Sequence, residues 1–177
     1  MKLQSGSISI ERIMGVLLLA LLLTVFIYKI LGIAGISEKM LIEGRIKQFQ
    51  AAIDIHFAGL MMQGKQQQAL QLEASNPLDF YKKAFPDQPL SDYHGERWKL
   101  PFAGMDEGAW MFDTHSRHLI YKLKQDDLVT NTDPILLRLQ WQVKPQIVEE
   151  NTLSGNGKRR RVESIKLESV YPFDWNN

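Results

Sequence analysis

The chain begins with a long apolar segment. Residues 13–36 are apolar or small, and Lys29 is the only charged residue among them. As a helix, such a run spans roughly 36 Å at about 1.5 Å per residue, more than the roughly 30 Å core of a bilayer. The apolar core of a secretory signal peptide is shorter, about 7–15 residues. We therefore predict a transmembrane helix over residues 13–36, preceded by a short flank or leader over residues 1–12.

After this run, apolar residues recur in steps of three and four, which places them on one stripe of an α-helix. The stripe comprises Ile42, Ile46, Phe49, Ile53, Phe57 and Leu60. No proline lies between Ser37 and Gly64, so the backbone has no obligatory break there. We predict that the membrane helix continues directly into an amphipathic helix. Ile55 and Met62 depart from the pattern on its polar side.

The pattern changes after residue 75. Asn76-Pro77-Leu78-Asp79 has the residues of a helix start, with Asn as N-cap and Pro at the first helical position. This predicts a short helix that ends before Pro86. Residues 86–108 contain three prolines and three glycines, and we interpret them as mainly loop.

Four later segments alternate between apolar and polar residues or are rich in strand-forming residues. They are residues 109–113, 118–123, 135–143 and 161–170. In the third segment, Leu139 and Trp141 fall on the face opposite Gln140. We predict a four-stranded antiparallel sheet whose apolar face is covered by the amphipathic helix, because such a face must be buried. The expected fold class is α+β, with residues 37–177 as one domain.

Composition and motifs narrow the chemistry. The chain has 177 residues, a net charge of +1 and no cysteine, which excludes disulfides, zinc–thiolate sites and cysteine nucleophiles. It contains no Gly-x-Ser-x-Gly, P-loop, His-Glu-x-x-His or Gly-x-Gly-x-x-Gly motif. We therefore expect no enzymatic activity, no catalytic residues, no metal, no cofactor and no small-molecule substrate.

Three local features are interpreted as structural. His115 and His118 lie beside a predicted turn without a Cys or carboxylate to complete a metal site. The basic run at residues 157–161 has no interleaved aromatic residue to stack on a base, so we interpret it as a solvated loop rather than a nucleic-acid contact. Four tryptophans are expected in the core, with Trp175 the one able to be exposed: Trp98, Trp110, Trp141 and Trp175.

A long N-terminal helix, half in a membrane and half on an antiparallel sheet, resembles the type IV pilin and pseudopilin family. In that family a short basic leader ends in Gly, cleavage follows, and a Glu is the fifth residue of the mature chain. By this resemblance Gly6 ends the leader, Ser7 starts the mature chain and Glu11 is the fifth residue. The resemblance implies that the Glu11 carboxylate pairs with a neighbouring subunit's terminal ammonium, since either charge alone is costly in an apolar medium.

Two residues depart from the family pattern. The family starts its mature chain with Phe or another large apolar residue, whereas this chain would start with Ser7. Arg12 directly follows Glu11 and can neutralise it locally. Two interpretations therefore stay open. Either the chain is processed after Gly6, or residues 1–12 are the cytoplasmic flank of an uncleaved signal anchor.

A second resemblance lies in the soluble part. Residues 76–96, NPLDFYKKAFPDQPLSDYHGE, and 108–123, GAWMFDTHSRHLIYKL, are similar to minor pilin-like proteins. They are most similar to the MshF family, which serves biogenesis of the mannose-sensitive haemagglutinin (MSHA) pilus. This implies a single-pass bacterial inner-membrane protein with a cytoplasmic N-terminus and a periplasmic pilin-like domain. Its expected partners are other pilins or pilus assembly proteins, with the chain as a minor pilin-like subunit or an accessory assembly factor.

A second function stays open. The chain can also be a bitopic envelope protein whose periplasmic domain binds a ligand or regulates a partner, with the helix as a tether only. The stretch from Ser7 to Met40 discriminates between the two. In an assembly protein its particular residues matter, whereas a tether requires only length and apolarity.

Overall fold

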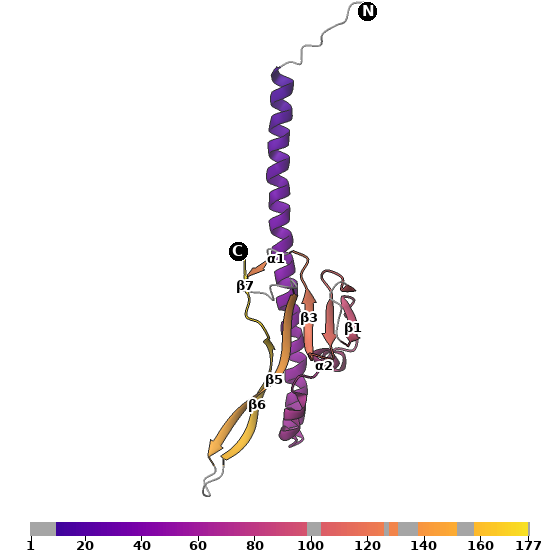
Figure 1. Cartoon of the computed structure of the whole chain (residues 1–177), viewed down its shortest axis with the longest axis vertical. Coiled ribbons are helices and arrows are strands. Elements are labelled where there is room, and N and C mark those ends of the chain that lie inside the picture. Colours follow the sequence, from indigo (N-terminus) through magenta and orange to yellow (C-terminus); the bar gives the residue numbers. More distant parts are fainter. Residues whose placement is uncertain (1–9, 99–103, 126–127, 131–137, 152–157, 177) are drawn as a thin grey trace, which may run out of the picture. The chain divides into compact units, whose positions relative to one another are not determined.

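The computed structural model describes residues 10–98, 104–125, 128–130, 138–151 and 158–176. The chain forms two compact units, residues 1–40 and residues 41–177, and each is described by itself. The elements in Figure 1 are α1 (Ile10–Met62), η1 (Gln66–Leu72), α2 (Pro77–Ala84), β1 (Tyr93–Arg97), β2 (Trp110–Asp113), β3 (His118–Lys122), β4 (Val129–Thr130), β5 (Arg138–Asn151), β6 (Lys158–Ser169) and β7 (Asp174–Trp175).

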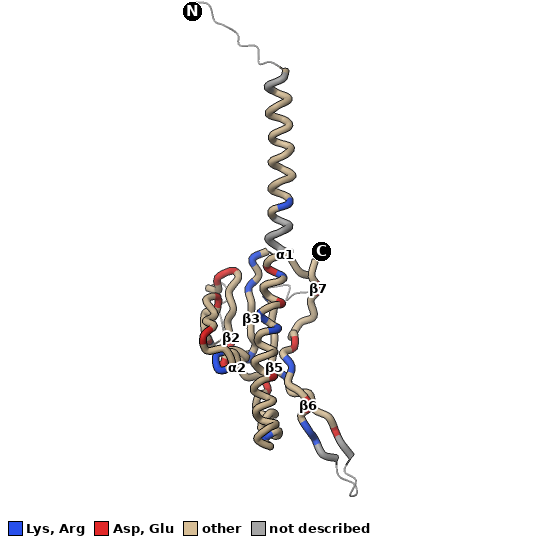
Figure 2. The backbone as a smooth tube through the Cα atoms, turned by 180° about the vertical axis from the view of Figure 1, so that it is seen from behind, with Lys and Arg blue, Asp and Glu red and all other residues tan. Residues whose placement is uncertain are grey.

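Helix α1 contains 53 residues and runs without interruption from the first unit into the second. In the first unit, the segment Ile13–Ile30 is long and apolar enough to cross a membrane, with a mean hydropathy of 2.5. Lys29 is the charged residue of this segment, and Figure 2 shows the segment as mostly uncharged. An N-terminal apolar helix that continues past the apolar run is therefore confirmed.

The end of α1 follows from a local backbone change. Gly64 has φ of 69°, in the left-handed region that glycine adopts without steric cost. The Gly64 amide donates to the Met61 carbonyl at 3.0 Å, and the Lys65 amide donates to the Leu60 carbonyl at 2.9 Å. These bonds satisfy carbonyls of the last turn, and the short helix η1 follows.

The main sheet differs from the predicted four-stranded antiparallel sheet. It has five strands in the order β1-β2-β3-β5-β6, and β1 pairs with β2 in parallel. The other three pairings are antiparallel. Strand β1 has the sequence YHGER and is half-buried or exposed throughout, so it lacks the apolar alternation on which the prediction relied. It joins the sheet through backbone pairing at its edge.

The predicted strands in the described residues are confirmed, with shifted ends. Trp110 in β2 lies opposite Tyr121 in β3, and Leu119 lies opposite Trp141 in β5. Strand β5 continues past Pro145 to Asn151, paired with β6. A separate two-stranded sheet joins β4 to β7.

The core of the second unit lies between α1 and one face of the main sheet, as Figure 1 shows. Phe49 of α1 is fully buried and makes edge-to-face contacts with Trp110, at 5.5 Å between ring centroids, and with Tyr81 of α2, at 5.6 Å. Trp110 in turn packs against Trp141 at 5.4 Å. Aromatic pairs in this geometry add to the free energy gained by burial alone.

Helix α2 begins as predicted. The Asn76 side chain accepts a hydrogen bond from the Leu78 amide at 3.0 Å, and Pro77 occupies the first turn. Helix α2 ends at Ala84, before Pro86. This cap fixes where the helix starts and turns its buried residues, Leu78 and Tyr81 among them, toward the core.

The expectation for the tryptophans is wrong at one position. Trp98 is 70% exposed and contacts the His115 ring at 4.9 Å. Trp175 is half-buried against Phe173. Trp98 directly follows β1 at the sheet edge, which the sequence pattern did not reveal as a strand. Its position outside the core could therefore not be predicted.

Candidate functional site

The predicted processing positions fall mainly outside the described part of the chain. Gly6 and Ser7 lie outside the described residues. Glu11 is in the first turn of α1, but its side chain is outside the described part as well. The cleavage of the leader and the pairing of Glu11 therefore stay predictions.

The apolar stripe predicted for residues 42–60 of α1, which we call the inner stripe, faces the sheet. Phe49 and Ile53 have 0% and 1% of their surface exposed. Ile46, Phe57 and Leu60 are partly buried and pack against the same core. Because the chain's own sheet occupies this stripe, the stripe stabilises the domain and is not open to a partner.

The opposite side of α1 carries a second set of uncharged residues, which we call the outer stripe. It comprises Leu41, Gly44, Gln48, Ala51, Ile55, Ala58 and Met62. Their spacing alternates between three and four residues. Exposure is 45% at Leu41, 55% at Ile55 and 90% at Met62. Ile55 and Met62 lie off the first stripe, and heptad steps place them on a second one.

The outer stripe has the composition of a helix-packing seam. Small residues, including Gly44 and Ala51, alternate with larger ones, of which Gln48 is polar and the rest are apolar. A methyl group added at Gly44 would meet no atom within 4 Å apart from the backbone of its own helix. Charged Lys47 and Asp54 lie beside the stripe rather than on it. Small and large residues at this spacing let a second helix approach closely and interdigitate. The stripe is therefore a candidate surface for packing against another helix.

The histidines do not form a metal site with their described neighbours. In residues 10–98 and the later described ranges, no group of three or more His, Cys, Asp or Glu side chains is arranged to hold an ion. His115 is exposed, as expected for a turn residue. His118 is instead the first residue of β3, and its Nδ1 lies 2.9 Å from the Gln140 amide. With the amide nitrogen facing His118, the Gln140 oxygen also accepts from Arg138.

A polar cluster joins α2 to β1. The buried Asn76 side chain donates to Glu96 Oε1 at 2.6 Å and to the Tyr93 hydroxyl at 3.3 Å. Burial raises the pKa of Tyr93 to about 12, although the Asn76 hydrogen bond opposes the shift. A tyrosine with a raised pKa stays protonated near neutral pH and is a poor general base. The cluster therefore supports the cap of α2 rather than acid–base chemistry at Tyr93.

Comparison of the chain with protein-family models, with curated proteins and with solved structures finds no match.

Proposed function

We propose that this chain is a non-enzymatic, single-pass inner-membrane protein that serves biogenesis of a type IV pilus of the MSHA kind. It acts as a minor pilin-like subunit or as an accessory assembly factor. In this proposal the N-terminus is cytoplasmic, the apolar segment of α1 crosses the membrane, and the second unit is periplasmic. Other pilins or pilus assembly proteins are its partners.

The outer stripe of α1 is the observation that carries the proposal. Of helix α1, a tether requires only the apolar segment Ile13–Ile30. The core of the second unit requires only the inner stripe of that helix. Neither requires uncharged residues in heptad steps on the exposed side of the helix, from Leu41 to Met62. A protein that assembles by packing its helix against other helices requires such a face.

The sheet supports a pilin-like plan in part. Strands β2, β3, β5 and β6 form a continuous antiparallel set, and α1 packs against it as the resemblance implies. The parallel strand β1 is an addition at one edge. Together with the resemblance of residues 76–96 and 108–123 to the MshF family, this arrangement favours an assembly protein over an isolated ligand-binding domain.

The test is piliation of a bacterium that encodes this chain. We expect deletion of its gene to reduce surface pilin, measured as sheared pilin on immunoblots. Complementation with Ile55→Asp should restore roughly tenfold less pilin than the wild-type chain, because a carboxylate on the outer stripe opposes apolar helix packing. Lys47→Asp changes an exposed residue beside the stripe and serves as the control, with wild-type piliation expected. Full piliation in the deletion strain would refute a role in pilus biogenesis.

A second comparison separates assembly from tethering. Residues 13–36 are exchanged for an unrelated apolar anchor of the same length, and Glu11→Ala is made separately. Reduced piliation in either variant supports an assembly role for the helix. If both variants and Ile55→Asp assemble pili normally, the helix is a tether and the function lies in the second unit.

Intact-mass measurement after co-expression with a prepilin peptidase decides processing. Loss of residues 1–6 would identify a prepilin-type subunit. An intact chain would identify an uncleaved accessory protein.

A further inference from the structure

Strands β5 and β6 extend beyond the rest of the main sheet. Strand β3 pairs with β5 only from Arg138 to Trp141, whereas β5 continues to Asn151 with β6 as its partner. Figure 1 shows the two strands projecting as a ribbon. Strand β6 is the last strand of the sheet, so one side of its backbone faces away from β5. An open strand edge of this kind can pair with another chain.

Side-chain amides occupy the outer edge of β6 at its C-terminal part. The Gln50 amide nitrogen donates to the Ile165 carbonyl at 2.8 Å, and its oxygen accepts from the Leu167 amide at 2.8 Å. The Gln66 amide of η1 donates to the Val162 carbonyl at 2.5 Å. Together these groups make the hydrogen bonds that a neighbouring strand would make, and this part of the edge is thereby closed.

The outer edge continues past the last of these amides, toward Arg160. Residues two apart in an antiparallel pair point their backbone groups the same way, and the pairing runs without irregularity from Val162 to Arg160. Because the Val162 carbonyl points away from β5, the amide and carbonyl of Arg160 do so too. A strand placed beside them would continue the series of bonds that Gln50 and Gln66 begin.

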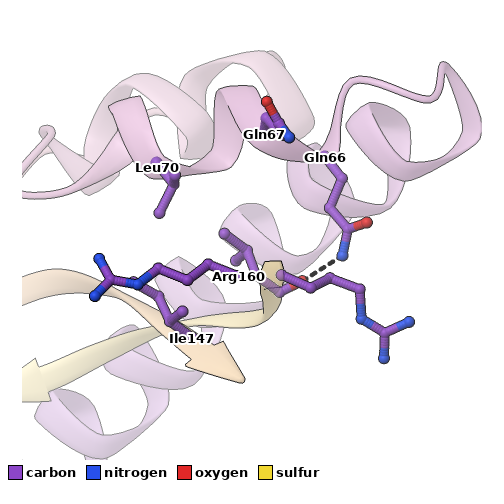
Figure 3. A pocket seen from close by; sticks show the side chains of 7 residues that line it. Gln66, Gln67, Leu70, Ile147 and Arg160 are labelled. Carbon is purple, nitrogen blue, oxygen red and sulfur yellow. Dashed lines mark hydrogen bonds between the residues drawn. The ribbon is translucent and has the colours of Figure 1, made fainter. Parts of the chain in front are cut away.

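A cavity of about 280 Å³ lies beside this part of the edge, between η1 and the ribbon, as Figure 3 shows. Its apolar lining includes Leu70, which is 43% exposed, and Ile147, which is 47% exposed. Gln67 also lines the cavity, and within the described residues its side-chain amide makes no hydrogen bond. The cavity therefore offers an apolar surface and an amide next to the strand edge.

The charge at this edge is positive. In the sequence, strand β6 begins with four basic residues, Lys158–Arg161. Figure 2 shows the described part of this run in blue on the ribbon. The Arg160 side chain is 72% exposed, and its Nε lies 3.6 Å from Glu149 Oε1. An exposed ion pair of this length contributes little to stability, so it does not hold the guanidinium against a competing carboxylate.

From these observations we propose that the outer edge of β6 at Arg160 binds an extended acidic segment of a partner protein. The segment adds as a strand, bonds to the Arg160 backbone and places a carboxylate against the Arg160 guanidinium. An apolar side chain two residues from that carboxylate, on the same face of the added strand, enters the cavity against Leu70 and Ile147. Strand addition gives affinity through main-chain bonds and specificity through the side-chain pockets.

The same charges decide against a second copy of this chain as the occupant. Two β6 edges brought together would oppose their basic runs, and like charges at a strand edge block edge-to-edge pairing. An acidic strand removes this repulsion and gains attraction. The inference does not use the outer stripe of α1, so it stands or fails independently of the proposed function.

The test uses the full-length protein in detergent micelles and fluorescently labelled hexapeptides, acetylated and amidated. One peptide carries Glu and Val in turn at every second position, with Thr between them, so that both kinds of side chain share one face of the strand. The matched peptide has Lys in place of Glu. We expect fluorescence anisotropy to show binding of the Glu peptide with a Kd below about 1 mM. The Lys peptide should bind at least roughly tenfold more weakly. Lack of binding by the Glu peptide, or equal binding of both peptides, overturns the proposal.

Variants separate charge from strand addition. Arg160→Glu should weaken Glu-peptide binding at least roughly tenfold, whereas Lys166→Glu, the same charge change at an exposed position of β6 away from the cavity, should not. Arg160→Ala and Arg160→Pro both remove the guanidinium, but only proline removes the backbone donor. The Arg160→Pro variant should therefore bind the Glu peptide roughly 2–10-fold more weakly than the Arg160→Ala variant does. This factor corresponds to the loss of one hydrogen bond. Equal affinities of these two variants would refute strand addition.

Nucleic acid is the competing occupant of a basic edge. A labelled oligothymidylate that binds the full-length protein more tightly than the Glu peptide, and displaces it, would assign the edge to nucleic acid and overturn the proposal. Failure of the oligothymidylate to compete supports the acidic segment.

Discussion

Ile53 and Ile55 lie two residues apart in α1 and have opposite environments. Ile53 is 1% exposed and belongs to the core between α1 and the sheet, whereas Ile55 is 55% exposed on the outer stripe. The same side chain therefore serves two purposes in one helix. At Ile53 apolarity stabilises the fold. At Ile55 most of the side chain lies outside the core, and we propose that its apolarity serves packing against a partner helix.

The two faces also differ in side-chain size. The inner face combines large residues such as Phe49 with aromatic rings from α2 and the sheet. The outer face alternates residues such as Gly44 and Ala51 with larger ones and has open space above Gly44. Large inward residues fill a core to high density, whereas small outward residues leave room for the approach of another helix. Substitutions matched between the faces test this distinction.

The largest expected effect is that of Ile53→Asp. A carboxylate in the core is desolvated without a partner, which costs several kcal/mol, comparable to the whole stability of a small domain. We expect the second unit of this variant to lose cooperative unfolding, measured by near-UV circular dichroism of the full-length protein in detergent.

Ile55→Asp is the matched control, because it makes the same change on the outer stripe. Its carboxylate stays hydrated, so the free energy of unfolding should change by only about 0.5 kcal/mol. A loss of cooperativity as large as that of Ile53→Asp would show that the outer stripe is part of the fold, and the distinction between the faces would be wrong.

Phe49→Ala should have the second-largest effect. The side chain is fully buried against Trp110 and Tyr81, and truncation of a buried Phe costs about 3–5 kcal/mol through lost transfer free energy and the cavity left behind. Denaturant unfolding monitored by tryptophan fluorescence measures the loss. Phe49→Leu refills much of the volume and should cost clearly less. Equal costs would indicate that the site does not depend on packing.

How far the fold could be predicted depended on whether each element carries its own pattern. The inner stripe of α1 and the cap at Asn76 are local patterns, and the sequence predicts both. Strand β1 has no such signal, because its residues are polar and contain Gly95 at φ of 94°. It is a strand because Tyr93 meets Trp110 across the sheet edge. Contacts of this kind join distant segments and are not encoded in local periodicity.

The candidate surfaces show the same limit. The heptad steps of the outer stripe are present in the sequence. When only one stripe is expected, however, Ile55 and Met62 look like exceptions to it, although they belong to a second stripe. The closed edge of β6 has no sequence signal. A glutamine at position 50 is an ordinary polar helix residue until the fold brings it to Ile165 and Leu167. Only the packing of α1 on the sheet gives it that role.

Gln50→Ala and Gln48→Ala compare two glutamines of α1 with different surroundings. Gln50 bonds to two backbone groups of β6, whereas Gln48 is exposed and accepts only from Arg45 in its described surroundings. Loss of the two bonds should destabilise the second unit by about 1–2 kcal/mol, and Gln48→Ala should be near neutral.

Chemical denaturation of the full-length protein in detergent measures the stability of both variants. Equal stability of the two variants would mean that water replaces the two hydrogen bonds of the Gln50 side chain without a loss of stability.

The smallest expected effect is a pH dependence from His56. Its ring packs against Phe80 at 5.0 Å, and burial, followed by the nearby positive charge of Lys83, lowers its pKa from 6.5. The folded chain therefore binds fewer protons here than the unfolded chain, so stability rises with pH in this range. The contribution is present above pH 6.5 and is lost as pH falls through the lowered pKa of the folded state.

We expect the wild-type chain to lose more stability than His56→Gln between about pH 7 and pH 5, in paired denaturant titrations. The difference between the two proteins isolates His56 from the other titrating groups. Because His56 is only partly buried, the difference should be smaller than the cost of Gln50→Ala. A wild-type chain that gained stability relative to the variant at low pH would show that the imidazolium is favoured in the fold, and the assigned environment of this part of α1 would be wrong.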